Sequence, residues 1–145
     1  MRTIRVFHVT AAQAALLTCA IAFLPVAAGA ADGDPRAGRE IYDRYCAACH
    51  GAGGRGDGPM RAVLTLQPTD LTQLVAGNGG TFPLGRVVAR IDGRDPLVAH
   101  GSPMPVYGDF FEGRDLTVHG DDGRPVLTTR PVADLVEYMR SLQTP

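Results

Sequence analysis

The stretch "CAACHGAGGRGDGP", residues 46–59, places two cysteines and a histidine directly before a run of glycines. Cys19 is the only other cysteine among the 145 residues of the chain. Three kinds of chemistry use cysteines at this spacing: a structural metal site, a redox-active disulfide, and covalent attachment of a cofactor. The rest of the sequence decides which of these the stretch serves.

The first 30 residues have the pattern of a signal peptide. Two arginines open the chain, residues 11–24 are predominantly apolar, and Ala28-Gly29-Ala30 is an A-x-A cleavage site. We therefore expect cleavage before Ala31 and a single periplasmic domain of residues 31–145. Cleavage removes two arginines and no acidic residue, so the net charge changes from −1 to −3. This mildly acidic balance argues against nucleic acid as a partner.

Two alternatives to a cleaved signal peptide arise from the same segment. A retained anchor would need an uninterrupted apolar run of about 20 residues, and Pro25 ends this one sooner. Lipidation of Cys19 would call for a small residue before it, where Thr18 stands. We expect no membrane span after processing.

The mature chain is predicted to be all-α, with four to five short helices. Asp34 and Pro35 are typical of a helix start, Thr69 can cap a later helix, and Gly93 can end another. Apolar residues at helical spacing mark the helix after Pro83, through Val87, Val88 and Ile91, and most clearly the last helix. The predicted helices span residues 35–46, 57–66, 70–76, 83–93 and 131–142.

One segment departs from the helical pattern. Residues 116–129 alternate apolar and polar residues on both sides of Asp122-Gly123, a pair typical of tight turns. The pattern fits a small β-hairpin and an irregular surface loop equally well.

Two of the three chemistries fit Cys46 and Cys49 poorly. A thioredoxin-type pair begins a helix that follows a strand, whereas this pair ends a predicted helix and precedes glycines. A structural zinc ion needs four ligands, and beyond the stretch itself the mature chain offers only His100 and His119.

Covalent haem attachment fits the stretch directly, because C-x-x-C-H is the attachment signature of c-type haem. Cys46 and Cys49, one helical turn apart, can bond the two vinyl groups of one porphyrin, which places the imidazole of His50 under the iron. A ligating histidine needs an acceptor for its other ring nitrogen. We expect that acceptor to be the carbonyl of Pro59, returned to His50 by a flexible glycine turn.

The second axial ligand is predicted to be Met104. Pro103 and Pro105 stiffen the loop on both sides of it, so the thioether can be held at small entropic cost. Met60 follows His50 too closely to reach the opposite face of the ring, and Met139 belongs to the apolar stripe of the last helix.

The remaining candidate ligands are His100 and His119. We expect a hydrogen-bonding or surface role for His100 and a solvated position for His119. A His/Met pair leaves no open coordination site and suits electron transfer. Arg86 and Arg90, one turn apart, form either a solvated helix face or a positive face toward haem propionates or an acidic partner.

The chain resembles a class I c-type cytochrome of the small bacterial exported kind. The resemblance lies in the last helix and in "YCAACHGAGGRGDGP" (45–59), "PTDLT" (68–72), "NGGTFP" (78–83) and "MPVYG" (104–108). It implies a cytochrome c fold around one covalently bound haem c, with His50 and Met104 as axial ligands. It also implies a contact between the first and last helices at Gly38, Tyr42 and Tyr138.

Two features depart from the family pattern. Tyr107 stands where similar sequences often carry tryptophan, and the link to the last helix, residues 112–130, is longer than usual. We expect Tyr45, Phe82 and Tyr107 to line the haem.

We therefore expect a one-electron carrier, not an enzyme, that exchanges electrons with redox protein partners. One alternative is a cytochrome subunit docked to a dehydrogenase or oxidase complex through an insertion at 109–130. Another is a gas sensor or peroxidase, which requires that Met104 does not bind the iron. Neither the partners nor the oligomeric state follows from the sequence.

Overall fold

The structure is a computed structural model that describes residues 33–94, 104–108 and 110–144. The predicted signal peptide with Cys19 lies outside the described residues, as do His100 and Pro103. The cleavage and the domain boundary at Ala31 therefore stay predictions.

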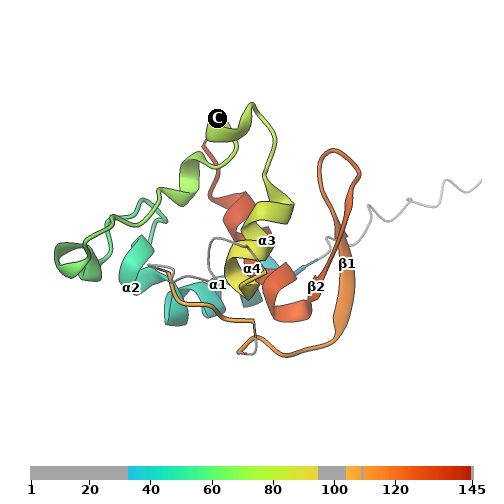
Figure 1. Ribbon diagram of the computed structural model, residues 1–145, viewed down its shortest axis with the longest axis horizontal. Helices are drawn as coiled ribbons and strands as arrows, with labels where there is room; N and C mark the ends of the chain where they lie inside the picture. Colours follow the sequence, from blue (N-terminus) through green and yellow to red (C-terminus); the bar gives the residue numbers. More distant parts are fainter. Residues whose placement is uncertain (1–32, 95–103, 109, 145) are drawn as a thin grey trace, which may run out of the picture.

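Short helices make up most of the regular structure (Figure 1). Among the described residues the α-helices are α1 (Pro35–Tyr45), α2 (Ala47–His50), α3 (Leu84–Asp92) and α4 (Arg130–Ser141). Three 3₁₀ helices connect α2 to α3: η1 (Pro59–Val63), η2 (Leu71–Gln73) and η3 (Ala76–Asn78). None of the helices in these residues is long and apolar enough to cross a membrane.

The predicted start of α1 and end of α3 are confirmed. The side chain of Asp34 accepts a hydrogen bond from the backbone N–H of Arg36, and Pro35 is the first helical residue. α3 ends at Gly93, whose φ of 80° is a left-handed conformation that glycine adopts at little cost.

The connection between α2 and α3 differs from the prediction of α-helices at 57–66 and 70–76. η1 ends before Leu64, whose backbone is extended, and Pro68 disfavours helix in the residue before it. After Asp70, whose backbone is also extended, only the short 3₁₀ helices η2 and η3 form. The predicted cap is also wrong by one residue. The carboxylate of Asp70, rather than Thr69, accepts the N–H of Thr72 at 2.9 Å.

Helices α1 and α4 cross at Gly38. A Cβ atom at this position would collide with the backbone oxygen of Asp134, so only glycine lets the two backbones approach this closely. One turn further on, the buried ring of Tyr42 lies 5.1 Å from the ring of Tyr138. The contact implied by the family resemblance is present, and it joins the first helix of the domain to the last.

The core forms between the apolar faces of α3 and α4. Leu135 and Val88 are 1 % and 0 % exposed, and burial of such side chains contributes about 1.5–3 kcal/mol each. The predicted stripes are confirmed. Their buried members are Val87, Val88 and Ile91 in α3, and Val132, Leu135, Val136 and Met139 in α4.

The segment whose pattern fitted either a loop or a hairpin is a hairpin. Strands β1 (Asp115–His119) and β2 (Pro125–Thr129) pair antiparallel, with Val118 opposite Val126. Val118 and Thr128 are buried, so one face of the ribbon packs on the body of the protein. In Figure 1 the hairpin lies on the opposite side of the molecule from η1.

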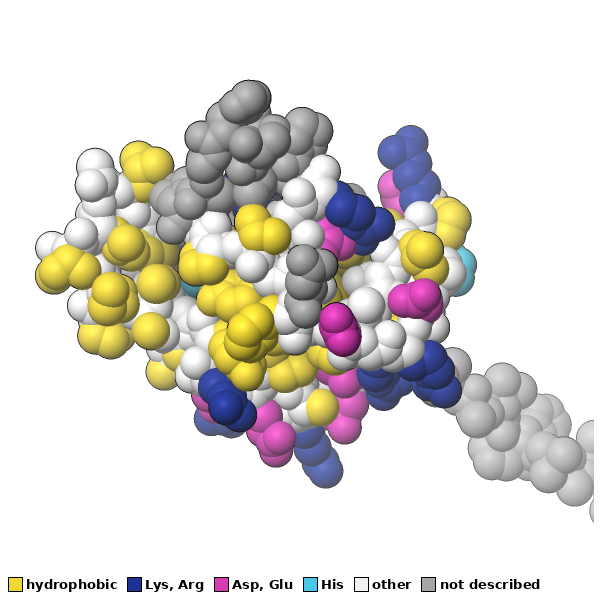
Figure 2. Space-filling model, turned by 60° about the horizontal axis from the view of Figure 1, so that its bottom comes forward, with side chains coloured by type: hydrophobic (Ala, Val, Ile, Leu, Met, Phe, Trp, Pro, Cys, Tyr) yellow, Lys and Arg dark blue, Asp and Glu magenta, His cyan; other side chains and the backbone are white. Residues whose placement is uncertain are grey.

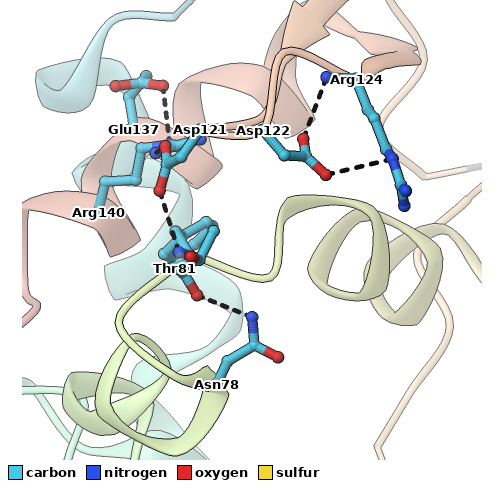
Figure 3. Close-up of polar contacts among 8 residues, drawn as sticks. Asn78, Thr81, Asp121, Asp122, Arg124, Glu137 and Arg140 are labelled. Atoms are coloured by element: carbon cyan, nitrogen blue, oxygen red, sulfur yellow. Dashed lines mark hydrogen bonds and ion pairs between the residues drawn. The ribbon is translucent and has the colours of Figure 1, made fainter.

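The tip of the hairpin is tied to the core (Figure 3). The carboxylate of Asp121 accepts a hydrogen bond from Arg140 of α4 at 2.7 Å and another from the backbone N–H of Phe82 at 3.0 Å. The guanidinium of Arg140 lies 4.7 Å from the centre of the Phe82 ring.

The described residues together form a mostly helical fold with one small two-stranded sheet. This agrees with the all-α prediction and is consistent with a cytochrome c fold.

Candidate functional site

The two cysteines lie on one turn of backbone at the junction of α1 and α2. Cys46 ends α1, and its carbonyl accepts the N–H groups of Cys49 at 3.1 Å and His50 at 2.9 Å. Both thiols are free and half-buried. This turn brings Cys46 and Cys49 to one side of the helix, with His50 directly after them.

The glycine loop after His50 is packed against this turn. The N–H of Gly56 donates to the carbonyl of His50 at 2.8 Å, and that of Gly58 donates to Cys49 at 3.1 Å. A Cβ atom on Gly58 would lie 2.5 Å from the carbonyl oxygen of Ala48. The expectation of a flexible turn is therefore wrong, because Gly58 is required for close approach of two backbones.

The expected acceptor for His50, the carbonyl of Pro59, is also wrong. Nδ1 of His50 lies 3.0 Å from the carbonyl oxygen of Thr69. The bonds of the glycine loop send Pro59 outward into the exposed helix η1, and the chain returns to the imidazole only at Pro68 and Thr69. "PTDLT" signalled a family likeness at this position, but no local pattern identifies a carbonyl as an acceptor.

The hydrogen bond determines the tautomer of His50. A carbonyl oxygen can only accept, so Nδ1 carries the proton and Nε2 keeps its lone pair. Burial lowers the pKa of the imidazole, and the bond to Thr69 opposes that shift in part. His50 is therefore neutral and has one nitrogen available as a metal ligand.

The thiol of Cys46 is held in its protonated form. Burial, and secondly the neighbouring Cys49, raise the pKa of Cys46 to about 11. A buried neutral thiol is stable beside an apolar wall, where a thiolate would be costly.

A cavity of about 490 Å³ brings the four predicted site residues together. Cys46, Cys49 and His50 line it from one end of the chain, and Met104 lines it from the loop that follows α3. The volume lies within the range of about 300–1,000 Å³ that is usual for cofactor sites. The remaining wall includes eight aliphatic or methionine side chains: Leu64, Leu66, Leu71, Leu74, Val87, Ile91, Leu135 and Met139.

The charged side chains that line the cavity are both positive. Arg86 and Arg90 lie one turn apart on α3, and none of the described acidic residues lines the wall. An apolar cavity with two cationic side chains fits a flat apolar group that carries two carboxylates. Haem is such a group.

The loop that carries Met104 is held from two sides through Tyr107. The backbone N–H of Tyr107 donates to the carbonyl of Ile91 in α3 at 2.8 Å, and its hydroxyl donates to the carbonyl of Tyr45 at 3.1 Å. Tyr45 and Tyr107 both line the cavity, as expected. Phe82 does not line it, because Asp121 and Arg140 hold this residue in the core.

The other predicted candidates take the positions expected of them where they are described. Met60 is 44 % exposed and does not line the cavity. Met139 is 4 % exposed and belongs to the core, although it also forms part of the cavity wall. His119 is exposed on β1, and among the described residues no group of three or more His, Cys, Asp or Glu side chains forms a metal site.

The segment beside the cavity leaves apolar surface exposed. Figure 2 shows hydrophobic side chains gathered at the left of the molecule, where η1 lies in Figure 1. Met60, Val63 and Leu66 in this region are 44 %, 73 % and 61 % exposed, and Leu66 also lines the cavity. Apolar surface of this kind indicates a site that a ligand or partner covers, so the residues fit an apolar prosthetic group.

Comparison with known proteins bears on the same part of the chain. Residues 33–91 match the family model described as cytochrome c oxidase, cbb3-type, subunit III. No curated protein and no solved structure matches the chain. The matched segment contains α1, α2, the glycine loop, the acceptor Thr69 and all but the last residue of α3. A domain of this type indicates haem c and electron transfer, and the match supports the resemblance to a class I c-type cytochrome drawn from the sequence.

Proposed function

We propose that the protein is a periplasmic one-electron carrier with a single haem c. In this proposal Cys46 and Cys49 attach the haem, and His50 and Met104 are its axial ligands. The observation that carries the proposal is the cavity, around which these four side chains gather from segments 54 residues apart in the sequence.

When bound, haem c supplies an iron that accepts and releases one electron. The residues of the chain would attach the haem and provide the ligands of its iron. The thiols of Cys46 and Cys49 would add across the two vinyl groups of the ring, so that the haem could not dissociate. Nε2 of His50 would be the ligand atom, because Nδ1 is engaged with Thr69.

Met104 would supply a thioether as the second ligand. The bonds of Tyr107 to Ile91 and Tyr45 hold the loop that carries Met104 against α3 and α1. A sulfur ligand on a held loop leaves no open site for oxygen or peroxide, which favours electron transfer over the sensor or peroxidase alternative.

Arg86 and Arg90 would receive the two propionates of the haem. They are the charged side chains in the described part of the cavity wall, and both come from α3. Arg86 is exposed and Arg90 half-buried, so solvent would screen these ion pairs and each would contribute at most about 1 kcal/mol.

Mass spectrometry and a redox titration test the proposal together. The protein isolated from a host that attaches haem c should have the mass of residues 31–145 plus one haem, even after denaturation. It should be reduced and reoxidised by one electron without loss. A mass equal to that of the bare chain, or a signal peptide still attached, would contradict the corresponding part of the proposal.

A second candidate function is that of a cytochrome subunit within a larger redox complex. Two observations favour it: the family model takes its description from an oxidase subunit, and the hairpin is fixed to the core rather than loose. A rigid ribbon that exposes Leu127 to 58 % presents a defined surface to a partner.

The hairpin's outer face can be tested without harm to its buried face. Leu127→Ser changes an exposed position on β2, and Ala76→Ser changes an exposed position on η3, outside both the hairpin and the cavity wall. If a complex forms through the hairpin, Leu127→Ser should slow reduction by the native donor and Ala76→Ser should not. Equal rates in wild type and Leu127→Ser would remove the docking role.

A further inference from the structure

Gln143, one residue beyond the C-cap of α4, uses its whole side-chain amide to hold another part of the chain. Nε2 donates to the carbonyl of Leu71 at 2.7 Å and to that of Met139 at 2.8 Å. Oε1 accepts the backbone N–H of Val75 at 3.0 Å. An amide has two N–H donors and one carbonyl oxygen, so these three bonds fix its orientation.

The segment that Gln143 holds carries the acceptor of His50. Thr69, whose carbonyl lies 3.0 Å from Nδ1 of His50, precedes Leu71 by two residues. Leu71 is tied on both sides, because its N–H donates to the carbonyl of Gly54 at 2.6 Å while its own carbonyl accepts from Gln143. A shift of Leu71 would therefore move Thr69 relative to the imidazole.

The short link between Thr69 and Leu71 is itself stiff. The carboxylate of Asp70 accepts both the backbone N–H of Thr72 at 2.9 Å and its hydroxyl at 2.7 Å. A link held in this way passes a displacement on instead of absorbing it.

We infer that Gln143 is a positioning residue for His50. By holding Leu71 and Val75 it fixes the carbonyl of Thr69, and through it the orientation and basicity of the imidazole. When Nδ1 of a histidine ligand donates a hydrogen bond, the nitrogen that binds the metal becomes more basic. This favours the oxidised metal. The inference rests on the proposed function, in which His50 binds the haem iron.

The chain offers a matched control in Gln73. Its amide also joins segment 71–75 to the C-terminal residues, since Nε2 donates to the hydroxyl of Thr144 at 2.6 Å. Gln73 is exposed and holds no backbone carbonyl of that segment in these contacts. Gln73→Leu therefore removes a bond between the same two segments without release of Leu71.

The experiment compares the haem-loaded wild type, Gln143→Leu and Gln73→Leu. In Gln143→Leu the equilibrium constant of reduction should shift toward the reduced form by about two- to tenfold, tenfold being 59 mV for one electron. The Nδ1–H of His50, observed by NMR in the reduced protein, should exchange faster with solvent. Gln73→Leu should match the wild type in both readouts.

The opposing results are equally specific. Gln143→Leu with wild-type potential and wild-type exchange at His50, whatever its stability, would show a merely structural role and overturn the inference. A wild type that carries no haem would overturn the inference and the proposed function together, whereas haem in all three proteins with no difference overturns the inference alone.

Two further measurements cover a variant that fails to fold. Gln143→Glu keeps an acceptor for Val75 and loses the donors to Leu71, so the Nδ1–H of His50 should exchange with solvent faster than in the wild type. In the unmodified protein, exchange of the Val75 amide and of the His50 Nδ1–H should respond in parallel to added denaturant. Independent responses would overturn the inference.

Discussion

The imidazole of His50 and the carbonyl of Thr69 lie 3.0 Å apart although 19 residues separate them in sequence. This one bond assigns the proton to Nδ1 and leaves Nε2 for a metal. It joins the attachment stretch to a segment that the last residues of the chain hold in place. The properties of the site therefore depend on residues that would never touch the haem.

Gly56 gives a direct way to disturb that bond. Its φ is 74°, and a Cβ atom there would collide with the carbonyl oxygen of Pro68, directly before Thr69. Gly56→Ala should lower the free energy of unfolding by about 1–3 kcal/mol and raise the reduction potential, because the His50 bond weakens. Gly53→Ala is the control, since nothing lies within 4 Å of a Cβ atom there. Equal potentials in the two variants would count against the account of His50.

Gly38 tests the crossing of α1 and α4. Gly38→Ala should destabilise the protein by about 1–3 kcal/mol in denaturant unfolding, because the added methyl forces the two backbones apart. Gly85→Ala, in the exposed part of α3, should instead stabilise it by about 0.5–1 kcal/mol through helix propensity. A Gly38→Ala protein as stable as wild type would show that the helices do not meet at this residue.

Asp121 should make the stability of the folded protein depend on pH in acid solution. The hydrogen bonds from Arg140 and from the N–H of Phe82 lower the pKa of Asp121 below its usual value of 3.8. Its contribution to stability is therefore complete above about pH 4 and is lost as the pH falls through the lowered pKa.

Asp121→Asn should accordingly lower the midpoint of thermal unfolding at pH 6. Below pH 4 the midpoint of this variant should depend less on pH than that of the wild type. Asp122→Asn is the matched control, because Asp122 bonds only to Arg124 and its backbone within the turn among the contacts described for it. If both variants have the same acid profile as wild type, the tip of the hairpin does not stabilise the core.

The two cysteines should determine whether the domain folds at all. Cys46→Ala combined with Cys49→Ala should give a largely unfolded chain that proteases degrade, because the attached ring completes the core around the cavity. Far-UV circular dichroism and a haem stain after denaturing electrophoresis measure this. Cys19→Ala should retain both helicity and haem. Recovery of a stable, helical, haem-free double variant would refute the prediction.

Short-range features were predictable from the sequence. The cap at Asp34, the end of α3 at Gly93 and the apolar stripe of α4 all depend on residues within a few positions of each other. The attachment stretch is local in the same sense, since Cys46, Cys49 and His50 share one helical turn. Patterns of this length determine backbone conformation almost without help from the rest of the chain.

Features fixed by distant contacts were not predictable. Thr69 becomes the acceptor of His50 because Gly54 and Gln143 hold Leu71, and no neighbouring residue signals either bond. Glycines in a row indicate a loop, but only the backbone beside Gly58 shows that the loop is tightly packed.

The hairpin and Phe82 illustrate the same limit. The alternating pattern at 116–129 left a loop and a hairpin equally plausible until the buried face and the Asp121 contacts were known. Those contacts also hold Phe82 in the core, 39 residues away in sequence from Asp121, and so away from the cavity that its aromatic ring was expected to line.

The central claim, that His50 and Met104 are the two axial ligands, is tested most directly by the optical spectrum of the oxidised protein. Bonding of a methionine sulfur to ferric haem iron gives a charge-transfer band in the far red. We expect this band in wild type and in Met60→Ala, its absence in Met104→Ala, and no binding of carbon monoxide to the reduced wild type. A wild type without the band, or a Met104→Ala protein that keeps it, would show that Met104 is not the ligand.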